Sequence, residues 1–576
     1  MKEIVPVDEF VSDEWYPGFT PGYGQAPWAT EPVDTFKKQD EARFWFLDFH
    51  FPRGLSPMGT VFLEDGYSWG TQLAAQTLPL PLGRGIVQRL AGTHVYASVV
   101  PMDSEWEAGV RAERFARNLP VFLERFPELW AERVGELETS LAYFEGYNLT
   151  GRSSDELAQY LRDARSFHRR AWEIHFEMMY PLLANYVGFH GLCSELGIDP
   201  GQISKFLQGY DTKILECDRE LWKLTAMARQ AGLADVFAAT EPEQLSDKLK
   251  AHDAATGWLG AFDDFLARFG WRTEGISDIN LAPWVEDPTS PLGTIKTFLR
   301  KSDAHDFDAA RKAAVEEREA AIDEAQSRLT AEEQEAFDAA LASCQQANFA
   351  WWNDEHNHYI DLRATIPLRR GCVAAATALG CDRPDDTLFL FWPELLSVLA
   401  DDDGYAAYKA LVEQRREYYE HWATRRSGMP KVLGTIPEEV TDPILIEIFG
   451  LHHRFFDTLR SAGEMSTSTL TGVAASSGVA RGRARVLHSA AELHRIEPGE
   501  VLVCEATSPN WTPAFAKIAA CVCDGGGTLT HASIISREYR IPCVVGAGVA
   551  TTVIHDGDEV EVDGTAGIVT LVRKDP

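Results

Sequence analysis

Basic residues are scarce in this chain. It contains 54 Lys and Arg against 87 Asp and Glu, which gives a formal net charge of −33 over 576 residues. Because a charge of this sign repels nucleic-acid phosphates and anionic lipid surfaces, we expect neither a nucleic acid nor a membrane as a partner. The sequence has no run near the roughly 20 apolar residues that cross a bilayer, and no apolar signal core follows Met1. These absences predict a cytoplasmic protein.

Cysteine is also sparse, and its spacing fits neither a disulfide framework nor a zinc site. The nine cysteines include no CxxC pair, and their number is odd. Cys521 and Cys523 share one face of an expected strand, where the simplest interpretation is small buried hydrophobic side chains. A third absence is the Walker-type GxxxxGK[ST] loop, so the sequence shows no nucleotide site of that class.

The composition that remains is that of a folded, multidomain protein. Apolar residues make up 45% and charged residues 24%, which is ordinary for globular chains, and the length allows two or more cores. Residues 1–460 are expected to form a mainly α-helical acceptor-binding domain, with a loop-and-strand N-terminal lobe up to about residue 105. A small polar run over 461–470 is interpreted as a linker. Residues 471–576 are expected to form a small α/β domain.

Strand-like runs with turn signals dominate this last segment. The expected strands are Val479 to Leu487, Glu500 to Cys504, Cys521 to Cys523, Ile541 to Val545, and the stretch from Glu559 to Val572. Capping boxes mark helices in the preceding region, with Ser153 and Glu156 opening a helix that runs to about Tyr180, and Thr330 with Glu333 opening another.

A glycine loop and a histidine form the most informative stretch of the sequence. Three glycines, from Gly525 to Gly527, allow a tight turn before a short helix expected from Ala532 to Tyr539 and capped by Thr530. The free N–H groups and partial positive charge of a helix N-terminus favour bound phosphate. A neutral imidazole at His531 is a competent nucleophile, so this position suits a phosphorylated histidine.

The stretch from Gly525 to Gly546, with Ile541-Pro542 and the later 563–567 run, resembles the mobile phosphohistidine domain of phosphoenolpyruvate-utilising enzymes. That family includes phosphoenolpyruvate synthase, pyruvate phosphate dikinase, rifampin phosphotransferase and phenylphosphate synthase. Thr530 stands where serine is more usual. The resemblance implies a swivelling domain in which His531 carries the phosphoryl group.

The loop residues of this motif are the expected phosphate-binding set. They are Gly526, Gly527, Thr528 and Thr530.

A polar stretch from Trp351 to Arg363 is the leading candidate for the acceptor site. On a regular helix, Asp354, His358 and Asp361 share one face, whereas His356, Tyr359 and Arg363 share another. Spacing favours His358 as the general base, because two carboxylates on its face would raise its basicity. A buried structural network of these groups is the alternative. No metal site is expected, because His356 and His358 diverge by about 200°.

The family resemblance points instead to His356. Relatives that phosphorylate aromatic compounds carry an acidic pair, a histidine and then tyrosine-isoleucine-aspartate. The corresponding residues here include Glu355, His356, Tyr359 and Asp361. Both histidines therefore remain candidates for the catalytic base, with Glu355 and Asp361 as catalytic carboxylates.

The remaining acceptor candidates are aromatic or cationic. His50 lies in an aromatic-rich run from Phe44 to Pro57, where rings could stack on a planar ligand. Arg272 lies in a second stretch that resembles the family, although Trp271 replaces the family's histidine; Arg272 could bind phosphate or pair with Glu274. Trp352 and Tyr359 complete the expected substrate-binding set.

Together these features predict an ATP-dependent phosphotransferase of the phenylphosphate synthase kind, active in aromatic compound catabolism. The resemblance implies that ATP, with Mg²⁺ or Mn²⁺, is bound by a separate ATP-grasp subunit of a hetero-oligomer. Fifteen of the sixteen tryptophans precede residue 466, which agrees with a small aromatic hydroxyl acceptor. The alternatives are a non-catalytic phosphocarrier or regulatory subunit, and a phosphoenolpyruvate synthase-like enzyme.

Overall fold

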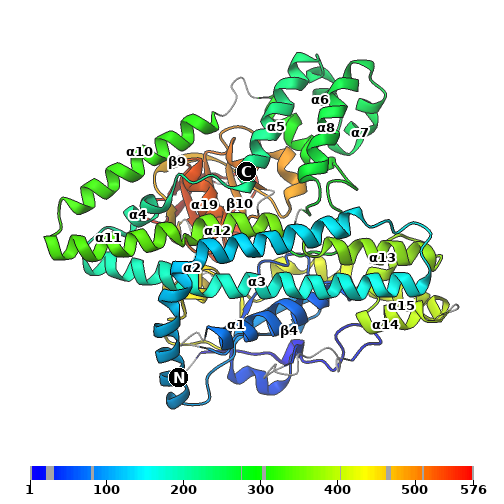
Figure 1. Cartoon of the computed structure of the whole chain (residues 1–576), viewed down its shortest axis with the longest axis horizontal. Helices are drawn as coiled ribbons and strands as arrows, with labels where there is room; N and C mark the ends of the chain where they lie inside the picture. Colours follow the sequence, from blue (N-terminus) through cyan, green and yellow to red (C-terminus); the bar gives the residue numbers. More distant parts are fainter. Residues whose placement is uncertain are drawn as a thin grey trace. The chain divides into compact units, whose positions relative to one another are not determined.

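The computed structural model describes residues 3–20, 32–78, 83–273, 275–300, 306–401, 404–461, 469–508 and 511–573. The chain forms two compact units, each built from three separate segments. Unit 1 comprises Met1–Leu182, Gly275–Leu281 and Tyr359–Glu439, and unit 2 comprises Leu183–Glu274, Ala282–His358 and Val440–Pro576. Figure 1 shows the elements in chain order by colour. The division at residues 461–470 that the sequence predicts stays a prediction.

Unit 1 contains a six-stranded sheet in the order β1-β6-β3-β5-β4-β2. Five of these strands come from the N-terminal region, as the loop-and-strand prediction requires. The sixth, β6, follows the helices and pairs antiparallel with both β1 and β3. Trp45 is fully buried in the core that this sheet builds. The strands are β1 Ile4–Val5, β2 Asp34–Thr35, β3 Phe44–Leu47, β4 Ile86–Ala91, β5 His94–Val99 and β6 Val432–Thr435.

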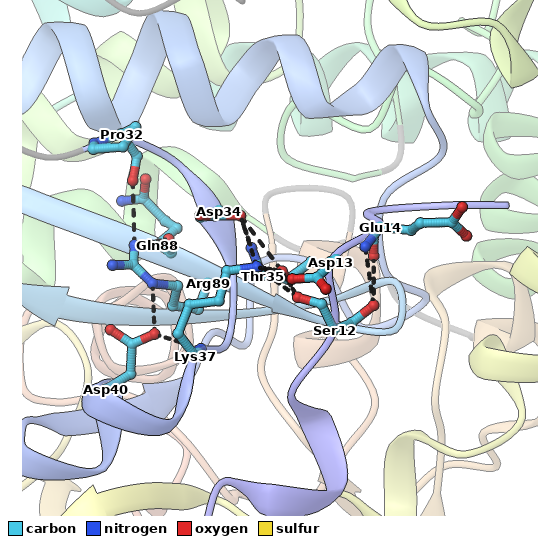
Figure 2. A network of polar contacts seen from close by, with 10 residues as sticks. All are labelled: Ser12, Asp13, Glu14, Pro32, Asp34, Thr35, Lys37, Asp40, Gln88 and Arg89. Carbon is cyan, nitrogen blue, oxygen red and sulfur yellow. Dashed lines mark hydrogen bonds and ion pairs between the residues drawn. The ribbon is translucent and has the colours of Figure 1, made fainter. Parts of the chain in front are cut away.

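A polar network, shown in Figure 2, ties the N-terminal segment to this sheet. Arg89 on β4 donates through Nε to the carboxylate of Asp40 at 3.0 Å and through a terminal nitrogen to the carbonyl of Pro32 at 3.2 Å. Lys37 donates to the carbonyl of Ser12 at 2.6 Å. The buried charge of Arg89 is thus paired, as a buried guanidinium requires.

The first long helix of unit 1, α2, begins at Glu105, at the predicted boundary of about residue 105. Ser153 and Glu156 form the expected capping box at the start of α3. However, α3 continues past the expected end at Tyr180 to Glu195, with Pro181 inside it. The helices assigned wholly or mainly to this unit are η1 Asp8–Phe10, η2 Lys38–Ala42, η3 Met58–Thr60, η4 Leu63–Thr71, α1 Gln72–Thr77, α2 Glu105–Gly146, α3 Ser154–Glu195, α13 Ile366–Ala378, η8 Asp386–Phe389, α14 Trp392–Leu399, α15 Gly404–Ala423 and η9 Arg426–Gly428.

The polar stretch from Trp351 to Arg363 is not one regular α-helix. After α12, which Asn348 caps, the chain forms the π-helix η7 over Asn357–Asp361. The expected faces assumed 3.6 residues per turn, whereas a π-helix bonds residue i to residue i+5 and rotates the side chains that follow. The predicted grouping of Asp354, His358 and Asp361 on one helical face is therefore wrong.

Unit 2 contains helices and a second sheet. The capping box of Thr330 and Glu333 opens α11 as predicted. The helices are α4 Pro200–Ile203, η5 Ser204–Leu207, α5 Lys213–Gln230, α6 Ala234–Ala239, α7 Pro242–Lys250, η6 Asp253–Ala255, α8 Thr256–Phe269, α9 Thr289–Leu299, α10 Phe307–Gln326, α11 Ala331–Gln346, α12 Phe349–His356, α16 Pro443–Glu447, α17 His453–Ser461, η10 Ala490–Arg495, α18 Thr512–Phe515, α19 His531–Glu538 and α20 Ala550–Val553. In the described parts of the chain, no helix combines the length and apolar character needed to cross a membrane.

The sheet of unit 2 has eight strands in the order β7-β14-β13-β9-β10-β11-β12-β8. Strands β9 to β12 are parallel, and apolar cores cover both faces, which is typical of a small α/β domain. Cys521 and Cys523 lie buried in one of these cores, as interpreted from the sequence. The strands are β7 Thr469–Thr471, β8 Val473–Ser476, β9 Val479–Val486, β10 Val501–Cys504, β11 Ala520–Cys523, β12 Cys543–Val545, β13 Glu559–Asp563 and β14 Ile568–Arg573.

The predicted linker over 461–470 is only partly covered by the structure. Ser461 ends α17, and Thr469 and Leu470 belong to β7, so neither end of the predicted run is free of secondary structure. Residues 462–468, which make up most of the predicted linker, lie outside the described residues.

Candidate active site

His531 is the first residue of α19, directly after the glycine loop that follows β11. Gly526 has φ +94, a conformation that glycine adopts without strain and that turns the chain toward the helix. Thr530 occupies the N-cap position, as predicted, but it makes no side-chain cap. Its hydroxyl donates instead to the carbonyl of Gly527 at 2.9 Å, as does the hydroxyl of Ser533 at 2.7 Å.

Two threonine hydroxyls hold the His531 ring. The hydroxyl of Thr507 lies 2.8 Å from Nδ1, and that of Thr512 lies 3.2 Å from Nε2. The residue is only 6% exposed, and burial lowers the pKa of His531 to about 3. The imidazole is therefore neutral near pH 7, the form that can attack phosphorus. Since both nitrogens are engaged, one of these hydroxyl contacts must break before the ring is phosphorylated.

The glycine loop packs closely against the segment that contains α16. The N–H of Leu529 donates to the carbonyl of Glu447 at 3.3 Å, and the hydroxyl of Thr528 donates to the carboxylate of the same residue. A Cβ on Gly527 would lie 2.4 Å from backbone oxygens of Ile446 and Glu447, so only glycine allows this approach. A phosphate-binding role for Gly526, Gly527, Thr528 and Thr530 stays a prediction. For Thr528, that role requires its hydroxyl to release the Glu447 carboxylate.

The two candidate bases on the polar stretch point in different directions. The ring of His356 stacks on that of Trp352, with centroids 4.1 Å apart, and its Nδ1 lies 3.1 Å from the Trp352 carbonyl oxygen. A guanidinium N–H of Arg272 donates to Nδ1 of His358 at 2.9 Å. A proton on that nitrogen would face the positive charge of Arg272, so His358 can act as a base only through Nε2.

The other predicted residues of unit 2 are largely buried. Trp352 is fully buried, so in this arrangement the face of its ring is covered. Arg272 is 2% exposed and lies over the rings of Phe269 and Trp284. Glu355 accepts the backbone N–H of Lys213 at 2.7 Å, which caps the first turn of α5. Glu274, the predicted partner of Arg272, lies outside the described residues.

The remaining predicted residues lie in unit 1. Nδ1 of His50 lies 2.6 Å from Oδ1 of Asp48, and the hydroxyl of Tyr67 donates to Oδ2 of Asp48 at 2.6 Å. Asp361 faces His175, whose Nδ1 lies 3.5 Å from its carboxylate. Tyr359 is 4% exposed and packs edge-on against Trp130, at 6.2 Å.

Sequence reasoning missed Asp48 and Tyr67 as functional candidates. The Asp-x-His spacing at Asp48 and His50 was the one available signal. Nothing in the sequence indicated that Tyr67, 19 positions from Asp48, would contact the same carboxylate.

Two segments of this chain match known protein families. Residues 496–567, which include His531, match the family described as the mobile domain of PEP-utilising enzymes. This chain carries a PEP-utilising enzyme mobile domain. Residues 174–354 match the fourth domain of rifampicin phosphotransferase, a range that includes Arg272 and Trp352. Both matches agree with the resemblance seen in the sequence.

Several curated proteins are similar over much of this chain. Chondramide synthase cmdD of Chondromyces crocatus is 30% identical over 94% of this chain, and the uncharacterized phosphotransferase YvkC of Bacillus subtilis is 28% identical over 92% of it. Rifampicin phosphotransferase of Bacillus subtilis is 26% identical over 58% of this chain. The chain spans only part of each relative: 14% of the first, 62% of the second and 37% of the third.

Within unit 2, the mobile domain is held against helices of the rifampicin phosphotransferase-like region. Lys517 donates to the hydroxyl of Thr297 at 3.0 Å and is 7% exposed. Tyr539, at the end of α19, donates to Asp218 on α5 at 3.5 Å. Burial raises the pKa of Asp218 to about 7. This contact is therefore between a tyrosine hydroxyl and a carboxyl group that is partly protonated near neutral pH.

Proposed function

We propose that this protein is a phosphotransferase that carries a phosphoryl group on His531 and passes it to a hydroxyl of a small aromatic acceptor. The observation that carries the proposal is the position of His531, at the first residue of α19 within the segment that matches the mobile domain. The neutral ring and the adjacent helix N-terminus suit a phosphohistidine.

Aromatic side chains in unit 1 support an aromatic acceptor. Phe62 contacts Trp172 edge-on at 4.7 Å, and Phe51 lies 5.1 Å from Phe62. Phe51, Phe62 and Trp172 are 2–3% exposed, so a phenol could stack on their planar faces only after these rings separate. The names of two relatives, phosphotransferase and rifampicin phosphotransferase, support group transfer as the reaction class.

The proposal places the nucleotide site, with ATP and Mg²⁺ or Mn²⁺, on a separate ATP-grasp subunit. A longer polypeptide that carries both functions is the alternative, because the relatives extend well beyond the region that they share with this chain. In either arrangement, the mobile domain receives the phosphoryl group at the nucleotide site and delivers it to the acceptor.

The carrier role can be tested without the nucleotide-binding partner. Phosphoramidate, a small phosphoryl donor to imidazoles, is incubated with the full chain, and the acid-labile phosphate is located by peptide mapping. We expect phosphate on His531 and none at this position in His531→Asn. His555→Asn is a matched control in the same domain, because His555 is well exposed and lies outside the glycine loop. Absence of phosphate from wild-type His531 would contradict the proposal.

The acceptor class is tested in a second step. Phosphorylated protein is isolated and mixed with phenol, pyruvate or buffer. We expect phenol-dependent loss of phosphohistidine with formation of a phosphate ester. Transfer to pyruvate alone would favour the phosphoenolpyruvate synthase-like alternative, and stable phosphohistidine in all three mixtures would favour a non-catalytic carrier.

A further inference from the structure

Asp48 and His50 in unit 1 form a rigidly held carboxylate–imidazole pair. The backbone N–H of His50 donates to Oδ1 of Asp48 at 2.9 Å, in addition to the ring contact at 2.6 Å. The backbone of Asp48 is fixed on both sides, because its N–H donates to the carbonyl of Val95 at 2.9 Å and its carbonyl accepts from Arg426 at 2.6 Å. With Nδ1 bound to the carboxylate, the ring exchanges its catalytic proton at Nε2.

The two members of this pair differ in solvent exposure. The side chain of Asp48 is fully buried, whereas 18% of the His50 side chain is exposed. Burial alone would raise the pKa of Asp48, but the charge of His50 and the hydrogen bonds from His50 and Tyr67 lower it below 3.8. Asp48 is therefore a fixed negative charge at physiological pH.

The charge of Asp48 in turn decides the basicity of His50. Burial lowers the pKa of His50, but the charge and hydrogen bond of Asp48, together with the charge of Asp361, raise it above 6.5. The groups that face the pair are Tyr67 from η4, Asp361 from η7 and Arg426 from η9. Tyr67 stays protonated, because burial and then Asp48 raise its pKa well above 10.

Aromatic rings surround this pair. Phe49 lies 4.3 Å from the His50 ring, and Tyr67 contacts Phe62 edge-on at 4.9 Å. Beyond them, Phe176 lies 6.3 Å from Tyr67 and 4.5 Å from His175. Phe62 and Phe176 are each 3% exposed, whereas Phe49, like His50, is only partly buried. A base with an anchored carboxylate beside a partly exposed ring suits deprotonation of a phenolic hydroxyl.

We propose that His50 is the general base that deprotonates the acceptor hydroxyl, and that Asp48 is its positioning residue. This inference rests on the proposed function and moves the base from the polar stretch to unit 1. It is favoured over His358, whose Nδ1 faces the cation of Arg272, and over His356, whose Nδ1 lies against a backbone carbonyl.

Phosphoryl transfer from His531 to the acceptor conserves atoms and charge. The acceptor hydroxyl gives its proton to Nε2 of His50 while its oxygen forms a bond to phosphorus. The P–N bond to His531 breaks, and its electron pair returns to the ring nitrogen. His50 then releases its proton to solvent, and His531 takes one up, so that phosphohistidine and a hydroxyl become neutral histidine and a phosphate ester.

The test uses the full chain, charged on His531 with phosphoramidate and then mixed with phenol. The rate of phosphohistidine loss is followed by ³¹P NMR from pH 5 to pH 9, at several phenol concentrations. We expect His50→Gln to be phosphorylated on His531 as wild type is. Its phosphoryl transfer to saturating phenol should be about 10²- to 10⁴-fold slower, with loss of the acid limb of the pH profile. Added imidazole should restore part of the rate in His50→Ala. His421→Gln, an exposed histidine of the same unit, should behave as wild type.

The outcomes separate this inference from the proposed function. Failure of wild type to charge on His531 overturns the carrier role itself. Normal charging with no phenol-dependent transfer leaves the carrier role intact but overturns the assignment of His50. Wild-type transfer by His50→Gln also overturns it, and so does a slower rate with an unchanged pH profile and no rescue by imidazole, because that pattern is expected of a purely structural residue.

Discussion

The two histidines to which we assign chemistry have opposite environments. His531 is surrounded by neutral threonine hydroxyls, and burial lowers its pKa to about 3. At His50, burial acts in the same direction, but the Asp48 carboxylate outweighs it and the pKa rises above 6.5. A nucleophile must be neutral before it attacks, whereas a base must hold the proton that it removes. The difference follows from the contacts of the two rings, a buried carboxylate at His50 and two threonine hydroxyls at His531.

Among changes to the surroundings of the two histidines, the largest expected effect comes from removing that carboxylate. Asp48→Asn should slow transfer from phosphorylated His531 to phenol by about 100-fold, because the amide neither fixes the ring tautomer nor stabilises its protonated form. The acid limb of the rate profile should move to lower pH, since the group that raises the pKa of His50 is gone. Single-turnover measurements of phosphohistidine loss between pH 5 and pH 9 test both effects.

Asp163→Asn is the matched control for this variant, because Asp163 is an exposed aspartate on α3 in the same unit. If Asp48→Asn kept the wild-type rate and pH profile, the contrast between the two histidines would have no part in transfer.

The reciprocal change places a carboxylate beside His531. Thr507→Asp should raise the pKa of His531 from about 3 by about 1 to 3, because the new charge favours the imidazolium form. Titration of the His531 ring by NMR measures this directly. Thr507→Asn, which has nearly the same shape and no charge, should leave the pKa close to its original value; an equal rise in both variants would point to altered packing instead of charge.

The two environments also predict opposite effects of pH on stability. The lowered pKa of His531 means that the unfolded chain binds a proton below about pH 6.5 while the folded chain does not, so stability falls as the pH drops toward 3. Between pH 7 and pH 5, protonation of this one residue in the unfolded chain should lower the free energy of unfolding by about 2 kcal/mol. The raised pKa of His50 has the opposite effect on stability. The stabilisation that His50 contributes is present below pH 6.5 and is lost as the pH rises through its folded-state pKa.

Denaturant unfolding of wild type and His531→Gln at pH 5 and pH 7 measures the first of these effects. The loss in free energy of unfolding from pH 7 to pH 5 should be smaller in His531→Gln than in wild type by about 2 kcal/mol. An identical difference in both proteins would show that the His531 ring is not kept neutral by burial.

The smallest effect is expected at Tyr67. Tyr67→Phe removes one hydrogen bond from the Asp48 carboxylate but leaves the pairing with His50, so transfer should slow only about threefold, in line with a loss of about 0.5–1 kcal/mol. The same single-turnover assay detects it. Tyr405→Phe provides the comparison, because Tyr405 makes a similar contact at 3.0 Å to Asp386 elsewhere in unit 1. Equal slowing in both variants would argue against a specific role for Tyr67.

Local sequence signals predicted the local features well. The glycine loop before His531, the capping boxes at Ser153 and Thr330, and the strands of the C-terminal segment depend on neighbouring residues only, and they were confirmed. The polar stretch of α12 and η7 was harder to predict, because a π-helix is not visible in residue spacing. Its predicted faces were wrong for that reason.

Long-range partners could not be predicted in this way. The contact between His358 and Arg272 spans 86 positions, and that between Thr528 and Glu447 spans 81. No periodicity connects residues so far apart, since their meeting depends on how helices and strands pack. The sequence therefore favoured a base on the polar stretch, where several charged groups are close in the chain.

The sequence by itself determined the type of chemistry, because three glycines followed by a histidine at a helix start specify a local geometry that suits phosphate wherever the domain lies. Only the tertiary structure decided the state of each side chain. Burial among hydroxyls keeps His531 neutral, and a buried carboxylate beside His50 makes it basic. The physical reason is that a pKa depends on desolvation and on charges within a few ångströms, and folding, more than chain order, decides which groups come that close.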